Sequence, residues 1–381
     1  MKRKILLLCV LAVFLSGCVD ILPSGIGEEA SPTATPVPPT ATPTAIPTHT
    51  PTPTAIPPTN TPTPTPVPPT STPRATATPR PMPPTPTPTP TLQGRFVFQV
   101  ASGGDIYRVK ADGTNLTRLT SGLDPSWSPD GGQIAFSRWT TPWGIYTINA
   151  DGGNEMLVFS SSVARSPVWS PDGRQIAFYF ETEGMTAPWK ECIAGYGCFV
   201  LIPPLVQQEW HIGVVDVGDG YFRQPYCDRF SFSPTWSVDG EWIAYNGDHG
   251  LSMTTVEGPN NRVLTENVHD HYPVWSPDGT RIAFMHWQHD HWEIYVMNAD
   301  GSGRWPLTSS SALLERRPHN VSPAWSPDGE QIAFLSDRGG DWEFYVMNAD
   351  GSNQRKILGG VTDRLNIMYR GVGERVISWG R

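Results

Sequence analysis

A five-residue unit recurs along the C-terminal part of the chain and limits the folds that the chain can adopt. The unit begins with Trp, carries Asp and Gly at its fourth and fifth positions, and usually reads Trp-Ser-Pro-Asp-Gly. Its shared residues are Trp127, Asp130, Gly131, Trp169, Asp172, Gly173, Trp236, Asp239, Gly240, Trp275, Asp278, Gly279, Trp325, Asp328 and Gly329. Internal repeats of roughly 40 residues are typical of propellers and solenoids.

A short apolar alternation follows each unit. It reads Ile-Ala-Phe at 134–136, 176–178, 282–284 and 332–334, and Ile-Ala-Tyr at 243–245. Such alternation predicts β-strands. Ser-Pro-Asp-Gly suits a tight turn before the strand, because Pro presets φ and Gly accepts a left-handed exit. Each repeat therefore supplies four short antiparallel strands, as a propeller blade does.

The full order of motifs resembles the TolB-like, WD-like (PD40-type) propeller repeat. That order is Trp-Ser-Pro-Asp-Gly, Ile-Ala-Phe, Ile-Tyr, Asn-Ala-Asp-Gly and Leu-Thr, and it covers nearly all of residues 95–381. The resemblance implies an all-β fold, a six-bladed β-propeller, with seven blades as the alternative.

Ring closure is expected to join the two ends of this domain. Five blades are complete, and residues 95–120 offer the outer strands of a sixth. We expect its inner strand near residues 365–370, with a degenerate copy of the unit at 369–373. Both 96–98 and 376–378 resemble the second strand of a blade, so which of them pairs there is left open.

The N-terminus predicts export and lipid attachment. Three basic residues precede an apolar run over residues 5–15 that is too short to span a bilayer, as in a signal peptide. Leu15-Ser16-Gly17-Cys18 resembles the bacterial lipoprotein signal, which implies that residues 1–17 are removed and that Cys18 is lipidated. An ordinary secretory signal is the alternative. We expect an extracytoplasmic, membrane-anchored lipoprotein, on the cell surface or the periplasmic side.

Residues 31–91, which follow an anchor-proximal segment at 18–30, are rich in Pro and Thr and contain no aromatic side chain. No core can form there, so we expect a disordered Pro/Thr-rich linker that acts as a spacer. O-linked sugars or a proline-recognising partner are alternatives. The folded domain then spans 92–381, with an insertion at about 181–210.

The net charge of the chain is −9, so nucleic acid is not an expected partner. Contact with the membrane is expected through the lipid anchor only.

The geometry of a propeller blade is expected to place the irregular segments on one face. Connections after the first and third strands share a face with the Asp-Gly turns, which we expect to be structural. A calcium loop needs several oxygen ligands at alternate positions, and each turn offers a single Asp. The opposite face carries the insertion and the connection 309–320, and variable loops on a rigid scaffold commonly bind.

Histidines gather on that second face. Five of them lie between residues 269 and 291, interleaved with Asp270 and Asp290. A transition-metal site, with zinc as the suitable ion, is predicted from the set His269, His271, His289, His291, Asp270 and Asp290. Solvated loop histidines are the alternative. A broader binding face comprises His249, Trp287, Trp292, His319, Trp189 and His211, whose aromatic rings suit a sugar or a peptide.

The remaining residues point to an interaction protein. Cys192 and Cys198 bracket five residues of the insertion and are expected to form a disulfide, which leaves Cys227 free or buried. The chain lacks Gly-x-Ser-x-Gly, His-Glu-x-x-His and phosphate-binding glycine loops, and no cofactor is expected apart from zinc. We therefore predict a monomeric scaffold that binds an envelope protein, peptide or glycan. The alternative is a metal-dependent hydrolase or lyase that uses the histidines.

Overall fold

The computed structural model describes residues 92–185, 189–193, 197–202, 206–310, 316–371 and 374–381, with the backbone alone between 185 and 205. The predicted signal peptide, anchor-proximal segment and Pro/Thr-rich tract lie outside the described residues. Within the described part of the chain, no helix has the length and apolar character needed to cross a membrane.

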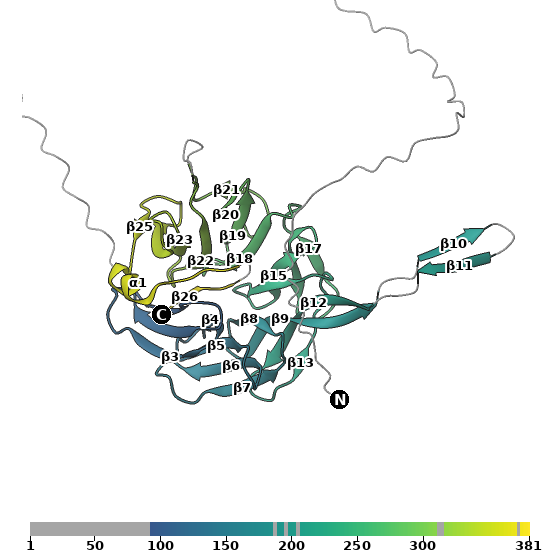
Figure 1. Cartoon of the computed structure of the whole chain (residues 1–381), viewed down its shortest axis with the longest axis horizontal. Coiled ribbons are helices and arrows are strands. Elements are labelled where there is room, and N and C mark those ends of the chain that lie inside the picture. The colour runs from purple at the N-terminus through teal and green to yellow at the C-terminus, as the bar shows by residue number, and fades with distance from the viewer. Residues whose placement is uncertain (1–91, 186–188, 194–196, 203–205, 311–315, 372–373) are drawn as a thin grey trace, which may run out of the picture. The chain divides into compact units, whose positions relative to one another are not determined.

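Six four-stranded antiparallel sheets form the domain (Figure 1). Blade 1 contains β4 (Leu123–Trp127), β5 (Gln133–Arg138), β6 (Gly144–Asn149) and β7 (Met156–Ser160). Blade 2 contains β8 (Arg165–Trp169), β9 (Gln175–Met185), β12 (Val206–Asp216) and β13 (Phe222–Arg223). Blade 3 contains β14 (Phe232–Trp236), β15 (Trp242–Gly247), β16 (Gly250–Thr255) and β17 (Asn261–Val263).

The other three blades complete the ring. Blade 4 contains β18 (Asp270–Trp275), β19 (Arg281–Gln288), β20 (His291–Asn298) and β21 (Trp305–Pro306). Blade 5 contains β22 (Asn320–Trp325), β23 (Gln331–Ser336), β24 (Glu343–Asn348) and β25 (Arg355–Lys356). Blade 6 contains β26 (Ile377–Gly380), β1 (Arg95–Gln99), β2 (Asp105–Lys110) and β3 (Thr117–Ser121). The inner strands contact one another in the order β4, β8, β14, β18, β22, β26 and back to β4, so the fold is the expected six-bladed propeller.

The strand that closes the ring differs from the expected one. Residues 96–98 lie in β1, the second strand of blade 6, and the inner strand is β26 rather than a strand near 365–370. Phe96 pairs with Trp379 as Ile134 pairs with Trp127 in blade 1. Trp379 therefore takes the place of the motif Trp, and the predicted degenerate copy at 369–373 was wrong. A short helix, α1 (Gly359–Leu365), precedes this segment.

Hydrogen bonds within each turn explain why the repeated unit folds as it does. In blade 1 the Ser128 hydroxyl donates to Asp130 Oδ1 at 2.6 Å and accepts from the Gln133 backbone N–H at 2.8 Å. Gly131 adopts φ 69°, a conformation that favours glycine. The same bonds recur in the other four copies of the unit. The Asp side chains of the unit thus hold the turns together with the Ser hydroxyl groups.

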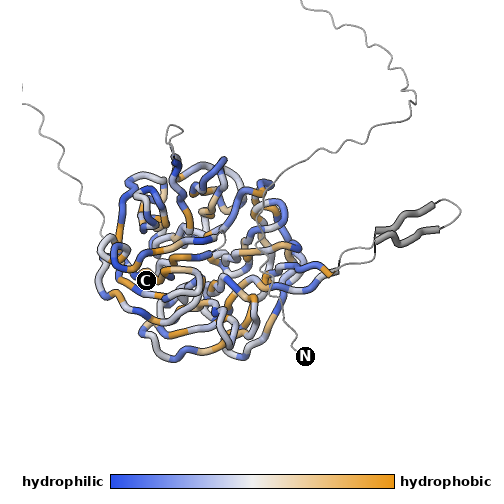
Figure 2. Tube along the Cα trace, viewed as in Figure 1, coloured by the Kyte–Doolittle hydropathy of each residue, from blue (hydrophilic) through white to orange (hydrophobic). Residues whose placement is uncertain are grey.

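The motif tryptophans pack between neighbouring blades. Trp127 contacts Val97 and Ile106 of blade 6 as well as its own blade. Trp236 and Trp325 also donate their indole N–H to a carbonyl of the preceding inner strand. Figure 2 shows hydrophobic stretches recurring along the strands, separated by hydrophilic turns. The core is therefore a series of interfaces between blades rather than one central cluster.

Two peripheral segments depart from the simple repeat. The insertion extends the second and third strands of blade 2, because β9 and β12 stay paired from Gln175 with Asp216 to Met185 with Val206. A separate hairpin, β10 (Trp189–Ile193) with β11 (Gly197–Ile202), lies between them in the chain. Of the expected outer Leu-Thr strands, 119–120 lies in β3, whereas 264–265 and 307–308 directly follow β17 and β21.

Candidate functional site

The two faces of the ring differ in chemistry. We call the face with the Trp-Ser-Pro-Asp-Gly turns the turn face, and the face with the connections between blades the loop face. All of the histidines from 269 to 291 lie at the loop-face end of blade 4, beside β18, β19 and β20.

One buried ionic group joins the first and second strands of blade 4. Asp270 and His286 are register partners on β18 and β19, and His286 Nδ1 lies 2.8 Å from Asp270 Oδ1. Arg304 donates to the same oxygen at 2.8 Å. Burial raises the pKa of Asp270 and lowers the pKa of His286, while the Arg304 charge opposes the first of these shifts. Asp270 therefore pairs with a histidine outside the predicted metal set.

A second buried group links blades 4 and 5. The side chain of His291 is 3 % exposed, with Nδ1 3.0 Å from Asp290 Oδ1 and Nε2 3.0 Å from Glu293 Oε1. Glu293 is also buried and accepts hydrogen bonds from the Thr308 hydroxyl and from Asn320 Nδ2. Contact with His291 lowers the pKa of Asp290, and a bond from Arg317 adds to this effect. These carboxylates are occupied by hydrogen bonds and position the loop-face end of blade 4.

Six aromatic rings form a continuous row along the loop face, which we call the aromatic row. Its members, in order of contact, are His271, Trp292, Trp287, His319, Trp342 and Tyr369. Successive ring centroids lie between 5.0 and 6.1 Å apart, within the range of favourable aromatic contacts. The row crosses blades 4 and 5 and reaches the segment between α1 and β26.

The members of this row are partly exposed. Trp292 is buried, whereas Trp287, His319, Trp342 and Tyr369 are half-buried. The His319 backbone N–H donates to Asp337 at 2.7 Å, and its ring nitrogen Nδ1 accepts from the Trp292 backbone N–H at 3.2 Å. Burial lowers the pKa of His319 and lowers that of His271 to about 4. Both shifts favour the neutral imidazole, which packs as an aromatic ring.

A charged rim borders the row. Arg316 pairs with Asp337, and Arg317 pairs with Asp290 at 3.1 Å. The Arg316 side chain is 66 % exposed. Aromatic side chains within a polar rim that includes arginine resemble the composition of protein-binding surfaces.

The other predicted site residues do not form a set of metal ligands within the described part of the chain. His249, His269 and His289 are exposed, and His289 occupies the turn between β19 and β20. Among the described residues, no group of three or more His, Cys, Asp or Glu side chains is arranged to hold a metal ion. The zinc site therefore stays a prediction, without a ready ligand set.

His211 belongs to blade 2. Its Nε2 lies 3.3 Å from Glu209 Oε2, and its Nδ1 lies 3.8 Å from the Cys227 thiol. Burial raises the pKa of Cys227, which is a free thiol. The side chain of Trp189 lies outside the described residues. The backbone register places Cys192 opposite Cys198 across the β10–β11 hairpin, and their disulfide remains a prediction.

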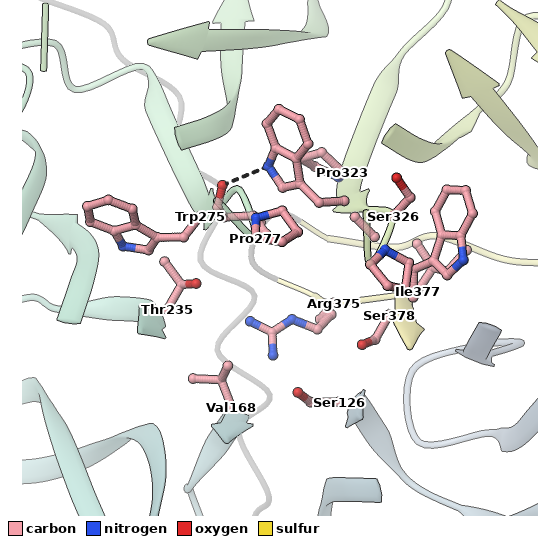
Figure 3. A pocket seen from close by; sticks show the side chains of 15 residues that line it. Ser126, Val168, Thr235, Trp275, Pro277, Pro323, Ser326, Arg375, Ile377 and Ser378 are labelled. Carbon is pink, nitrogen blue, oxygen red and sulfur yellow. Dashed lines mark hydrogen bonds between the residues drawn. The ribbon is translucent and has the colours of Figure 1, made fainter. Parts of the chain in front are cut away.

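The structure also contains an axial pocket that the sequence did not predict. It opens on the turn face, has a volume of about 210 Å³, and contains Arg375 (Figure 3). Each blade contributes the residue before its inner Trp: Ser126, Val168, Thr235, Val274, Ala324 and Ser378.

Comparison with known proteins assigns the domain. Residues 199–372 match the family model of the TolB beta propeller domain. The domain has the fold of a TolB-like β-propeller. No curated protein sequence matches the chain. The TolB-like propeller has 17 % sequence identity to TolB from Acinetobacter baumannii, with a TM-score of 0.56, over 76 % of this chain and 67 % of that one.

Two further solved structures share the fold. A putative TolB from Agrobacterium tumefaciens is 18 % identical, with a TM-score of 0.52, over 74 % of this chain and 90 % of that one. The hydrazine synthase of Kuenenia stuttgartiensis is 13 % identical, with a TM-score of 0.52, over 76 % of this chain and 46 % of that one. The TM-scores show that the TolB-like propeller has the same fold as these proteins. Because the sequence identities are low, its function has to be argued from its own residues.

Proposed function

We propose that this protein is a cell-envelope lipoprotein whose TolB-like propeller binds a protein or peptide partner through the aromatic row. The observation that carries this proposal is the row itself, in which four half-buried rings lie side by side on the loop face. A monomeric propeller with one irregular face and one regular face suits display of that surface to a partner.

The composition of the surface favours a protein over a glycan. Trp, Tyr and Arg dominate the energetics of protein interfaces, and the aromatic centre here is bordered by the Arg316–Asp337 and Arg317–Asp290 pairs. The rings are also fixed before binding, since Trp287 contacts both Trp292 and His319. Fixed side chains lose little conformational entropy on association, which favours affinity.

Crosslinking followed by truncation tests this proposal. A photoreactive amino acid placed at Trp342 in the full chain should crosslink an envelope protein in cells. Trp287→Ala and Trp342→Ala should each weaken binding of that captured partner by about tenfold or more, since truncation at the centre of an interface commonly costs about 2 kcal/mol. Trp305→Ala is the matched control, because Trp305 is exposed on the outer strand β21.

A protein partner would be refuted if the photoreactive residue in the row captured no protein, or if all three variants bound the captured protein equally well. If both row variants bound purified cell-wall glycans as well as the wild type does, the row would likewise be excluded as a glycan site.

Attachment to the membrane rests on Cys18 and has its own test. The mature full chain should carry a diacylglyceryl group on Cys18, visible as an added lipid mass on its N-terminal peptide. Cys18→Ser should leave the signal unprocessed or release the protein from the membrane fraction. A wild-type N-terminus without lipid would instead indicate an ordinary secretory signal.

The alternative function, a metal-dependent enzyme, can be tested directly by measuring bound metal. Elemental mass spectrometry of the chain purified on a non-chelating column should be compared with a variant in which His269, His271, His289 and His291 are changed to Ala. Near-stoichiometric zinc that is lost in the variant would support a metal site and justify assays for hydrolase or lyase activity. Metal-free wild type would remove this alternative and leave the binding scaffold.

A further inference from the structure

The axial pocket contains a buried cation whose charge has no carboxylate partner in direct contact. Arg375 is 7 % exposed. Its Nη1 donates to the Pro167 carbonyl at 2.9 Å and its Nη2 to the Pro234 carbonyl at 3.4 Å. Both acceptors are neutral, and among the described residues no carboxylate bonds the guanidinium. A guanidinium has five N–H donors, so these two bonds leave donors available.

The buried Asp124 carboxylate bonds the backbone of Arg375 and not its guanidinium. Asp124 Oδ1 accepts the backbone N–H of Arg375 at 2.7 Å, and its Oδ2 accepts the backbone N–H of Ser166 at 3.1 Å. Burial also raises the pKa of Asp124, because the ionised form loses its hydration there. The Arg375 charge opposes this rise, so the two groups attract each other without a hydrogen bond between guanidinium and carboxylate. A ligand anion would supply the direct contact that this buried cation lacks.

The walls of the pocket suit the remainder of such a ligand. Ser126, Thr235 and Ser378 supply hydroxyl groups from three different blades, and Trp275 and Trp379 supply apolar surface. Figure 3 shows the Arg375 guanidinium in the middle of the view, between Val168 and Thr235 on one side and Ser126 on the other. The pocket volume of about 210 Å³ is below the ~300–1,000 Å³ of sites for drug-sized ligands, so the pocket admits a small acid or the end of a chain.

We infer that this axial pocket binds a carboxylate, which pairs with Arg375 and with the hydroxyl groups around it. A monoanion matches the pocket, because Arg375 is the one charged side chain among its described lining residues. The carboxylate belongs either to a small organic acid or to the C-terminus of a peptide. The site lies on the turn face and is independent of the partner proposed for the loop face.

Saturation-transfer NMR with the purified full chain tests this inference, and the probes are acetate, N-acetyl-Ala-Ala with a free carboxylate, and its C-terminal amide. We expect acetate and the acid to bind with millimolar or tighter affinity and the amide to show at least tenfold weaker binding. If the peptide acid binds tenfold more tightly than acetate, the ligand is a chain terminus. If the peptide acid and acetate bind with equal affinity, the ligand is a small acid. Inorganic phosphate that binds more tightly than both carboxylates would overturn the assignment of a carboxylate as the ligand.

Variants connect this binding to the pocket. Ser126→Asp supplies a competing carboxylate beside Arg375 and should abolish acetate binding, and Thr235→Asp should do the same from the other side of the pocket. Neither change removes the bonds of Arg375 to the Pro167 and Pro234 carbonyls. Asn115→Asp adds the same charge at an exposed position of the turn face and should bind as wild type does. Absence of carboxylate binding by the wild type, or undiminished binding by both pocket variants, would overturn the inference.

Discussion

Truncation of Trp379 provides a quantitative test of how the ring closes. Its side chain is 8 % exposed, its ring centroid lies 4.6 Å from that of Phe96, and its indole N–H donates to the Gln93 carbonyl at 2.8 Å. Replacement of a buried Trp by Ala commonly costs about 3–5 kcal/mol. We therefore expect Trp379→Ala to lower the free energy of unfolding by about 4 kcal/mol.

Urea unfolding followed by circular dichroism measures this loss. For an m-value of about 3 kcal/mol/M, the expected loss lowers the midpoint by about 1.3 M. Trp325→Ala should lose a similar amount, because Trp325 occupies the corresponding position in blade 5. Trp305→Ala, at an exposed outer strand, should stay within about 0.5 kcal/mol of wild type. A loss below about 1 kcal/mol for Trp379→Ala, beside a large loss for Trp325→Ala, would show that β26 does not close the ring.

Three further predictions concern the loop face and the insertion. Glu293→Gln should destabilise the domain by about 2 kcal/mol in the same assay, because the amide cannot accept every buried hydrogen bond that the carboxylate accepts from Thr308 and Asn320; an unchanged midpoint would contradict these contacts. The pKa of His271 is lowered to about 4 in the folded protein, against 6.5 ordinarily, so the unfolded chain binds the proton first as the pH falls. Wild type should therefore lose about 3 kcal/mol of stability between pH 7 and pH 4 that a His271→Gln variant does not lose, and parallel pH profiles would argue against a buried neutral ring. Alkylation of the denatured, unreduced chain should label Cys227 and leave Cys192 and Cys198 protected, whereas labelling of all three would exclude the disulfide.

The blade architecture was predictable because its signals are local. Ser128, Asp130 and Gly131 form a turn whose hydrogen bonds lie within five residues of one another. Five near-identical copies then give the number of complete blades directly. The ring-closing strand was missed because its segment carries Trp379 without the following Ser-Pro-Asp-Gly turn. Its Val376-Ile377 pair also resembles a second strand.

The functional surfaces were predicted less completely, because they depend on contacts between blades. The density of histidines in the sequence located the loop-face end of blade 4, but it did not predict which residues each histidine contacts. A signal for one pair was present: counting outward from the paired Trp275 and Ile282 brings Asp270 close to His286 once the bulge in β18 is included. Arg375 carries no motif, and its pocket is formed by residues from all six blades. A spacing argument along one chain segment cannot bring such residues together.

The late position of β26 in the chain has a consequence for how the protein reaches its folded state. Blades 1 to 5 are each built from one stretch of the chain, so they can assemble before β26 is available, as in an open array of repeats. Blade 6 is incomplete until residues 377–380 pair with β1, and before that step Phe96 and Phe98 lack their partners on the inner strand. During that interval the growing molecule presents an unpaired apolar strand edge, which is a site for aggregation or for capture by a chaperone. Pairing of β26 with β1 removes that edge, so the change from an aggregation-prone to a protected strand is concentrated in the single step that closes the ring.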